Sequence, residues 1–193
     1  MEKIAAKHPA PAGFTLIEII FIIAIISVLL AIFTPLALKN IEEGRNDRAQ
    51  KDVKTISAMI NDLEKDAGQF PGSKLASGKT FLCGPGSVGL SGQTWGTSST
   101  CEDLANHLAT NNPGNTASTS DDYPSSGRFL WKGPYITNLS GDPWGNAYQI
   151  NASTLISGNT SPTWVISAGP DGNFQTSTSS TSLSGDDIGE RIK

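Results

Sequence analysis

Histidine and cysteine are scarce in this sequence of 193 residues, which contains two of each. Ligands this few and this widely separated do not make a zinc module, which needs clustered Cys and His side chains. Charged residues are also few, at 17%, and the formal net charge is −4. The chain therefore lacks the excess of basic residues that nucleic-acid binding requires, and we predict no nucleic-acid partner.

Catalytic motifs are missing as well. Ser, His and Asp occur, but no spacing pairs a nucleophile with a base, and the sequence contains no phosphate-binding loop or catalytic metal motif. The length allows one ordinary domain with an appendage, which argues against a large multidomain enzyme. We therefore expect no enzymatic activity.

One long apolar segment, residues 14–38, carries a single charged side chain, that of Glu18. About 20 apolar residues cross a bilayer, so this segment predicts a membrane-spanning helix, and it is longer than the apolar region of a secretory signal. Lys3 and Lys7 precede it, and positive charge stays cytoplasmic, which places the rest of the chain on the far side. A plain uncleaved anchor is the simplest interpretation of the segment taken alone.

The sequence GFTLIE at residues 13–18 resembles the cleavage and methylation motif of the type IV pilin and pseudopilin family. The resemblance implies that the prepilin peptidase cuts between Gly13 and Phe14, removing residues 1–13 as a leader and leaving Phe14 to be N-methylated. It also implies that Glu18 pairs with the Phe14 amine of a neighbouring subunit and sets the register of a filament. An unpaired carboxylate inside a bilayer costs about 2.5–3.5 kcal/mol, so the alternative is that Glu18 reaches the lipid headgroups.

Pro35 lies near the end of the apolar segment. Within a helix it removes one hydrogen bond and kinks or locally melts the backbone. The helix of family filaments is often loosened around this position, so the resemblance adds Pro35 to the assembly residues. The sequence does not separate this interpretation from a simple kink at the membrane surface.

Residues 39–71 continue as a predicted amphipathic helix. Its apolar positions follow one another at intervals of three and four, which places them on one face: Ala49, Val53, Ile56, Ile60, Leu63 and Ala67. Gly68 is a plausible stop, and the Phe-Pro pair at residues 70–71 closes the element. We interpret the stripe as core that packs on a sheet and not as a cofactor site.

Residues 72–127 are rich in Gly, Ser, Thr and Asn and lack a regular pattern, which predicts a long variable loop with one short helical stretch at residues 101–109. Cys83 and Cys101 lie on either side of its Gly/Ser-rich part. In an oxidising compartment outside the cytoplasm, two such cysteines are expected to form a disulfide that closes the loop. Two free thiols are the alternative.

Residues 128–193 combine short β-rich runs with turn residues, which predicts a small antiparallel sheet. The motifs GPY, DPWGN with a following YQ, SAGPDG and GDDIG occur in this order. Together with GFTLIE they are similar to the major pseudopilins of type II secretion systems, over roughly residues 13–71 and 131–189. The insertion at 72–127 and a longer spacer at 173–184 depart from that pattern.

Asp171, Asp186 and Asp187 lie in Gly/Ser-rich loops with no basic residue between them. Three carboxylates brought together repel one another unless a hard cation bridges them, and calcium prefers oxygen ligands of this kind. The pseudopilin resemblance implies a calcium ion held by these three side chains and by the carbonyl of Ala168. A solvated acidic tail is the alternative, because the spacer is altered.

The sequence thus predicts an α+β, pilin-like fold in which a long N-terminal helix, membrane-spanning in its first half, packs on a small antiparallel sheet with long loops. The resemblance implies a structural subunit of a type II secretion filament that drives proteins through an outer-membrane channel. Its implied partners are copies of itself, minor pseudopilins, the prepilin peptidase and the inner-membrane assembly platform. The head would lie in the periplasm, anchored to the inner membrane or assembled into a periplasmic or extracellular filament.

Two competing functions stay open at this point. One is a type IV pilin for adhesion, motility or DNA uptake, which usually ends in a disulfide-bounded C-terminal loop. The other is a monomeric membrane-anchored binding module that displays residues 72–127. The mid-chain cysteines and the late acidic motif favour the secretion filament over the pilin.

Overall fold

The computed structural model describes residues 13–193. The expected leader, with Lys3 and Lys7, lies outside the described residues except for Gly13. The chain divides into two compact units, one ending at Glu43 and the other spanning Gly44–Lys193. Helix α1, Leu16–Ala67, contributes to both units.

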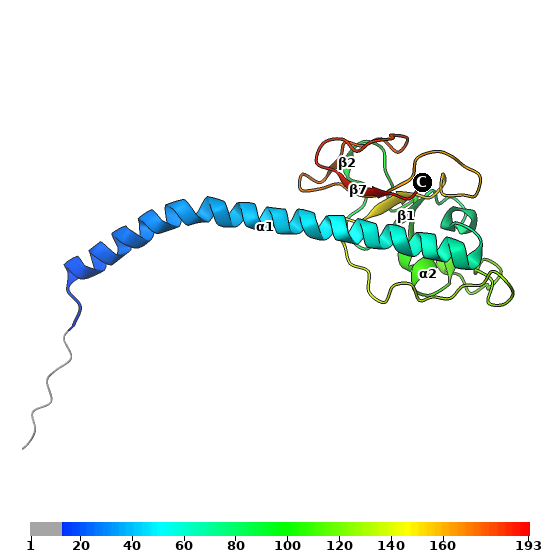
Figure 1. The fold of residues 1–193 in the computed structure, drawn as a ribbon, viewed down its shortest axis with the longest axis horizontal. Coiled ribbons are helices and arrows are strands. Elements are labelled where there is room, and N and C mark those ends of the chain that lie inside the picture. The colour runs from blue at the N-terminus through cyan, green and yellow to red at the C-terminus, as the bar shows by residue number, and fades with distance from the viewer. Residues whose placement is uncertain (1–12) are drawn as a thin grey trace, which may run out of the picture. The chain divides into compact units, whose positions relative to one another are not determined.

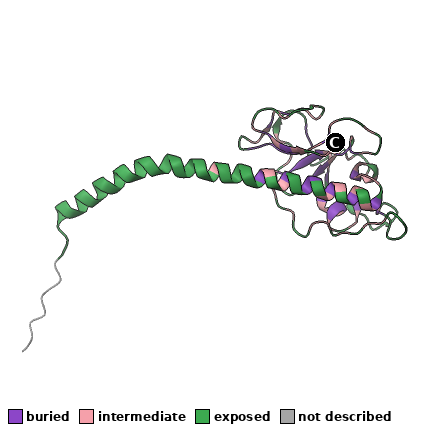
Figure 2. Ribbon diagram, viewed as in Figure 1, coloured by how far each residue is buried: buried purple, intermediate pink, exposed green. Residues whose placement is uncertain are grey.

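In the first unit, residues 16–38 of α1 are exposed, as the green ribbon of Figure 2 shows, and nearly all of them are apolar. Within this stretch the hydroxyls of Ser27 and Thr34 donate to the carbonyls of Ile23 and Leu30, at 2.8 and 2.7 Å. The helix continues through Pro35 without a break. A polar group that is satisfied within its own helix does not oppose an apolar environment.

In the second unit, α1 buries the predicted stripe. The buried apolar residues of α1 are the six that the spacing indicates: Ala49, Val53, Ile56, Ile60, Leu63 and Ala67. The predicted stop is also confirmed, because Gly68 adopts a φ of 71° directly after the last helical residue. A short 3₁₀ helix, η1 (Pro71–Lys74), follows.

The main sheet has five short strands in the order β3-β1-β4-β5-β7. Their bounds are β1 Phe81–Cys83, β3 Cys101–Asp103, β4 Gln149–Asn151, β5 Trp164–Ser167 and β7 Ile188–Arg191. Strand β1 runs parallel to β3, whereas the other neighbours are antiparallel. The sheet is therefore mixed, which corrects the expected antiparallel arrangement.

A second, two-stranded sheet joins β2 (Ser91–Gly92) in parallel to β6 (Asn173–Phe174). Helix α2 (Leu104–Leu108) falls within the predicted helical stretch, and η2 (Pro113–Asn115) follows it. Figure 1 shows the strands and α2 gathered around the second half of α1. Residues 72–127 therefore supply two of the five strands of the main sheet, so the prediction of an irregular loop is wrong for these parts. Strands of three residues are too short to show alternation in the sequence.

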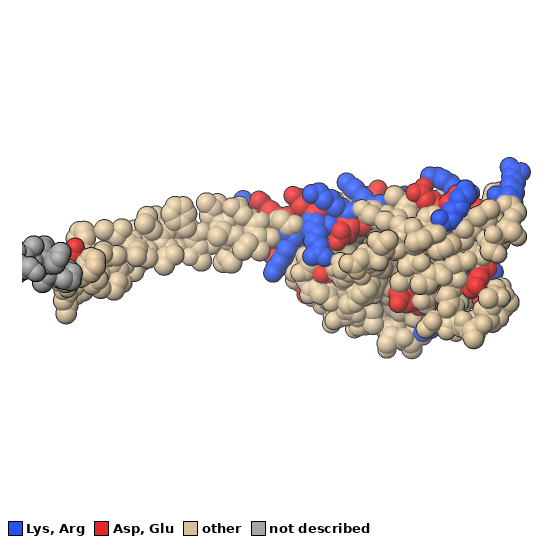
Figure 3. Space-filling model, turned by 90° about the horizontal axis from the view of Figure 1, so that it is seen from below, with Lys and Arg blue, Asp and Glu red and all other residues tan. Residues whose placement is uncertain are grey.

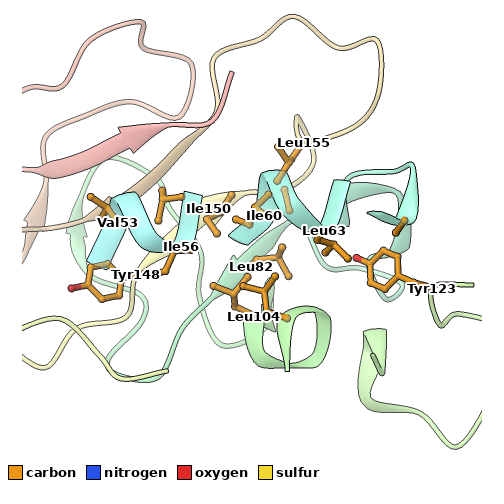
Figure 4. Close-up of a cluster of buried hydrophobic side chains, with 14 residues drawn as sticks. Val53, Ile56, Ile60, Leu63, Leu82, Leu104, Tyr123, Tyr148, Ile150 and Leu155 are labelled. Carbon is orange, nitrogen blue, oxygen red and sulfur yellow. The ribbon is translucent and has the colours of Figure 1, made fainter. Parts of the chain in front are cut away.

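One hydrophobic core joins α1 to the sheet and to α2. In Figure 4, side chains of α1 such as Ile60 and Leu63 meet Leu82 of β1, Leu104 of α2 and Ile150 of β4. All five are fully buried. Because α1 alone among the described elements contributes a continuous stripe to this cluster, the fold of the second unit depends on it.

Two carboxylates of α1 add polar connections at the edges of this core. The Tyr148 hydroxyl donates to Asp52 at 2.9 Å, and the Tyr135 hydroxyl donates to Asp66 at 3.1 Å. Burial, followed by the hydrogen bond to Asp52, raises the pKa of Tyr148 far above its ordinary value. The phenol therefore stays a donor at every physiological pH, and the helix is fixed to the 135–148 region at both ends of the stripe.

We expect Ile60→Ala to lower the free energy of unfolding by about 2–5 kcal/mol, because it leaves a cavity at a fully buried position. Ile60→Val, the matched control, should cost only about 0.5–1.5 kcal/mol. Urea unfolding of the detergent-solubilised chain, followed by tryptophan fluorescence, measures both. Equal losses in the two variants would contradict the central place of this side chain.

Candidate functional site

The N-terminal segment combines an exposed apolar surface with one carboxylate. Phe14, Leu16 and Ile17 are about three-quarters exposed, and large exposed apolar side chains continue along α1 to Ile41. Residues 14–38 contain no Lys or Arg, and Figure 3 shows the blue and red side chains gathered beyond this stretch. An 18-residue window of α1 has a mean hydropathy of 3.1 and none of it is buried, so by length and composition the helix can cross a membrane.

Glu18 lies in the first turn of α1, where it takes part in capping the N-terminus of the helix. Its backbone N–H donates to the Thr15 hydroxyl at 3.3 Å, while its carboxylate accepts from the Thr15 backbone N–H at 3.5 Å. This reciprocal arrangement is a capping box, and the sequence T-L-I-E at residues 15–18 has its signature. We did not predict this interaction from the sequence. It directs the carboxylate toward the chain end at which Phe14 becomes the terminus if the leader is removed.

The acidic residues lie in two loops that follow β5 and precede β7. The Asp171 carboxylate accepts from the backbone N–H of Asn173 and from the side-chain amide of Gln175, both at 2.7 Å. The Asp186 carboxylate accepts from the backbone N–H of Asp171 at 3.2 Å. The structure therefore joins the two acidic loops directly, and Ala168 lies fully buried where the first of them begins.

Asp187 is the most buried of the three carboxylates, at 7% exposure. One oxygen, Oδ2, accepts from the backbone N–H groups of Gln175 and Thr176 at 3.0 and 2.6 Å. The other, Oδ1, is buried without a hydrogen-bond partner in the described chain, and so is Oε1 of the Gln175 side chain. Burial raises the pKa of Asp187, although the hydrogen bonds from Thr176 and Gln175 lower it in part.

These oxygens decide how well a cation fits. In the described residues no three His, Cys, Asp or Glu side chains come together as a metal-binding group, so the predicted aspartate set is near but not assembled as ligands. Buried, unpartnered carboxylate and amide oxygens, however, are the donors that calcium accepts. The donor chemistry of the loops therefore fits calcium, whereas their present hydrogen bonds occupy most of the carboxylate oxygens.

The DPWGN motif at residues 142–146 contacts the chain just before the acidic loops. Asp142 is 5% exposed, and its Oδ1 accepts from the backbone N–H groups of Trp144 and Asn146 at 3.0 and 2.8 Å. Its Oδ2 accepts from the hydroxyl of Ser167, the last residue of β5, at 2.6 Å. The motif is thus a turn whose aspartate holds the end of β5 directly before Ala168.

The predicted disulfide is present between Cys83 and Cys101, with a Cα–Cα distance of 5.6 Å. It joins the end of β1 to the start of β3. The segment between the cysteines, residues 84–100, we call the disulfide loop. The loop contains β2, which pairs with β6 beside the acidic residues.

A buried polar network, which we did not predict from the sequence, fixes the rest of the insertion. His107 is fully buried, with Nδ1 2.6 Å from the Tyr123 hydroxyl and Nε2 2.9 Å from Glu102 Oε1. Glu102 also accepts from the backbone N–H groups of Ala76 and Gly114, at 2.8 and 2.5 Å. The Glu102 carboxylate thus bonds directly to residues 76, 107 and 114, and the network reaches Tyr123 through His107.

The network sets the ionisation of its members. Burial opposes the charge of Glu102, but the hydrogen bonds from His107, Ala76 and Gly114 outweigh it and lower the pKa of the Glu102 carboxyl. Burial, with the nearby Glu102 charge, raises the pKa of Tyr123 well above its ordinary value. Both groups therefore keep the ionisation state that the hydrogen bonds require.

We expect Glu102→Gln to lower the free energy of unfolding at pH 7 by about 1–3 kcal/mol, because it replaces charge-assisted hydrogen bonds. A lowered folded-state pKa stabilises the protein above the unfolded-state pKa of about 4.3, and this contribution disappears as the pH falls through the folded value. Urea unfolding at pH 7 and below pH 4 should therefore show a difference that shrinks on acidification.

The control is Glu43→Gln, which removes an exposed carboxylate 3.6 Å from Lys39. Such surface pairs contribute at most about 1 kcal/mol. A Glu102→Gln loss that is no larger than the Glu43→Gln loss, or that is constant with pH, would contradict the proposed part of the carboxylate in the network.

Comparisons with known proteins agree with the motifs. The family model of type II secretion system protein G matches residues 116–185. The type II secretion system core protein G of Pectobacterium carotovorum subsp. carotovorum is 26% identical over 160 residues, which cover 83% of this chain and 76% of that protein. No solved structure matches the chain significantly. The resemblance to type II secretion pseudopilins is therefore confirmed.

Proposed function

We propose that this chain, which is related to core protein G of type II secretion systems, is the major pseudopilin of such a system. It serves as a structural subunit, and its activity is assembly into a filament that pushes proteins through the secretion channel. The observation that carries the proposal is the exposed apolar surface of residues 14–38, with Glu18 as their one charge. A surface of this kind needs lipid or other apolar helices around it.

In this proposal the prepilin peptidase cuts between Gly13 and Phe14, and Phe14 is then N-methylated. The mature chain waits in the inner membrane with its head in the periplasm. The assembly platform moves it into a filament with minor pseudopilins, so that the filament is periplasmic or extracellular. The N-terminal helix and the relation to protein G support inner-membrane anchoring.

Glu18 supplies register in this assembly. Among the described residues, its carboxylate accepts one hydrogen bond of 3.5 Å, from Thr15, and it can therefore pair with a stronger donor. The Phe14 amine of a neighbouring copy is a cation, and a charge-assisted bond to it is stronger than the present one. Since 14–38 contains no other charge, an axial shift between two helices would leave both groups unpaired. Pro35, which removes one hydrogen bond from the helix, allows it to loosen where filament packing requires it.

We further propose that the acidic loops bind calcium through Asp171, Asp186, Asp187 and the Ala168 carbonyl. The unpartnered Oδ1 of the buried Asp187 supports this, because a bound cation offsets the cost of burying that charge. Calcium would close the two loops into one unit, whereas the chain itself orients the oxygens through the backbone donors at 175 and 176.

We expect Glu18→Ala to lower the yield of filaments by at least about tenfold, because losing one partner of a buried ion pair costs about 3–5 kcal/mol. The measurement is electron microscopy and quantification of sheared filaments from cells that carry the assembly machinery. Glu43→Ala, which removes an exposed glutamate of the same helix, is the control. An undiminished yield would favour the monomeric binding module.

For calcium, we expect a melting temperature about 5–10 °C higher at calcium concentrations about a hundred times the Kd than in chelator. Asp187→Ala should abolish this difference. Asp62→Ala, at an exposed position of α1, should retain it. Differential scanning fluorimetry of the purified chain gives the result, and identical curves with calcium and chelator would remove the calcium assignment.

A further inference from the structure

We propose that the disulfide loop, residues 84–100, positions the acidic loops for calcium, with Trp95 as its principal contact. The inference rests on the calcium site proposed above. It assigns a function to the insertion, which is a departure of this chain from the family pattern. The loop reaches Asp187 through the β2–β6 pair, Trp95 and Thr176.

Backbone pairing is the first contact. Gly92 of β2 lies opposite Phe174 of β6, and the next residue, Gln93, donates its backbone N–H to the Phe174 carbonyl at 2.7 Å. A Cβ on Gly92 would lie 2.1 Å from that carbonyl oxygen, and its φ is 95°. Only glycine allows the two segments to come this close.

Trp95 is the second contact. Its side chain is 5% exposed and stacks on Phe174, with ring centroids 5.1 Å apart and an interplanar angle of 29°. Its indole N–H donates to the Thr176 carbonyl at 2.8 Å, and this bond is buried. A buried indole that both stacks and donates fixes the backbone of residues 174–176.

The disulfide loop is also attached to the main sheet, through Gln149 of β4 and through the disulfide. The backbone N–H of Gly96 donates to the side-chain oxygen of Gln149 at 2.7 Å, and the Gln149 amide donates back to the Gly96 carbonyl at 3.3 Å. Gln149 is fully buried in β4. Together with the disulfide between Cys83 and Cys101, this pair anchors the loop to the main sheet.

Thr176 connects this support to the acidic residues. Its carbonyl accepts from Trp95, while its N–H donates to Asp187 Oδ2 at 2.6 Å. The two bonds share one residue, so the indole holds the donor that fixes one oxygen of Asp187. The other oxygen, Oδ1, is thereby left buried and unpartnered among the described residues, in a side chain that is 7% exposed. Positioning of Thr176 thus prepares Asp187 for a cation.

The test uses the detergent-solubilised chain and calcium itself. Trp95→Phe keeps an aromatic ring but removes the donor to Thr176, and we expect calcium binding about 2- to 10-fold weaker by isothermal titration calorimetry. Trp95→Ala, which also removes the stacking, should weaken binding further. Trp131→Phe is the matched control, since its indole donates to the His107 carbonyl at 3.1 Å, outside this region, and its affinity should not change.

Hydrogen exchange in chelator provides a readout that does not depend on calcium. The amides of Gln175 and Thr176 should exchange faster in Trp95→Phe than in the parent chain. Unchanged exchange would overturn the claim that the Trp95 hydrogen bond fixes the backbone at Thr176. Equal calcium affinity of Trp95→Phe and parent would overturn the positioning role even if exchange changes. A parent chain that binds no calcium would instead overturn the calcium site on which the inference rests.

Discussion

The exposed apolar surface of α1 is the constraint on which the proposed function depends. Apolar side chains cover the helix from its start to Ile41, and they are not buried by any described part of the chain. Lipid can cover this surface, and so can copies of the same helix, which are about as apolar as lipid. Small differences in free energy then decide whether the helix lies in lipid or among other copies of itself. Glu18 is the natural source of such a difference, since its charge is costly in lipid and can be paired in a filament.

The same helix organises the head by a different principle. Beyond Gly44 the buried apolar residues of α1 form one stripe, and strands β1, β4 and β5 contribute side chains to the core around it. The strands have only two to four residues each, and short strands need support from a helix to be stable. The disulfide and the Glu102 network then fix the insertion against this frame. The head is thus built from many local connections around one continuous element.

The predictable parts of this molecule were those with a local pattern. The intervals of three and four from Ala49 to Ala67 indicated the buried stripe, and Gly68 indicated its end, because both depend on neighbours in the sequence. The disulfide followed from topology and from having only two cysteines. Strand β1 was not predicted, since three residues carry too little periodicity, and its β3 partner comes from the same polar insertion.

Contacts between distant residues left no such signal. Trp95 and Thr176 are 81 positions apart, and Gln149 and Gly96 are 53 apart. No local sequence pattern therefore predicts either contact. For the acidic loops, the sequence indicated the ligand chemistry but not the arrangement. The Asp171 backbone N–H donates to the Asp186 carboxylate, while the Asp171 carboxylate accepts from the Gln175 amide. Calcium stays a prediction that the unpartnered oxygens support.

Asp187 connects the insertion to the acidic loops, through Thr176 and Trp95. A carboxylate buried to this extent is costly unless all its oxygens are satisfied, and here the backbone satisfies only one. Thr176 fixes the satisfied oxygen of Asp187, and Trp95 of the insertion fixes Thr176 in turn. A rigid support that leaves one oxygen unsatisfied lowers the ordering that an incoming cation must impose, which is how preorganisation raises affinity. In the proposed calcium site, the insertion that departs from the family pattern would therefore raise the affinity for the ion that this pattern implies.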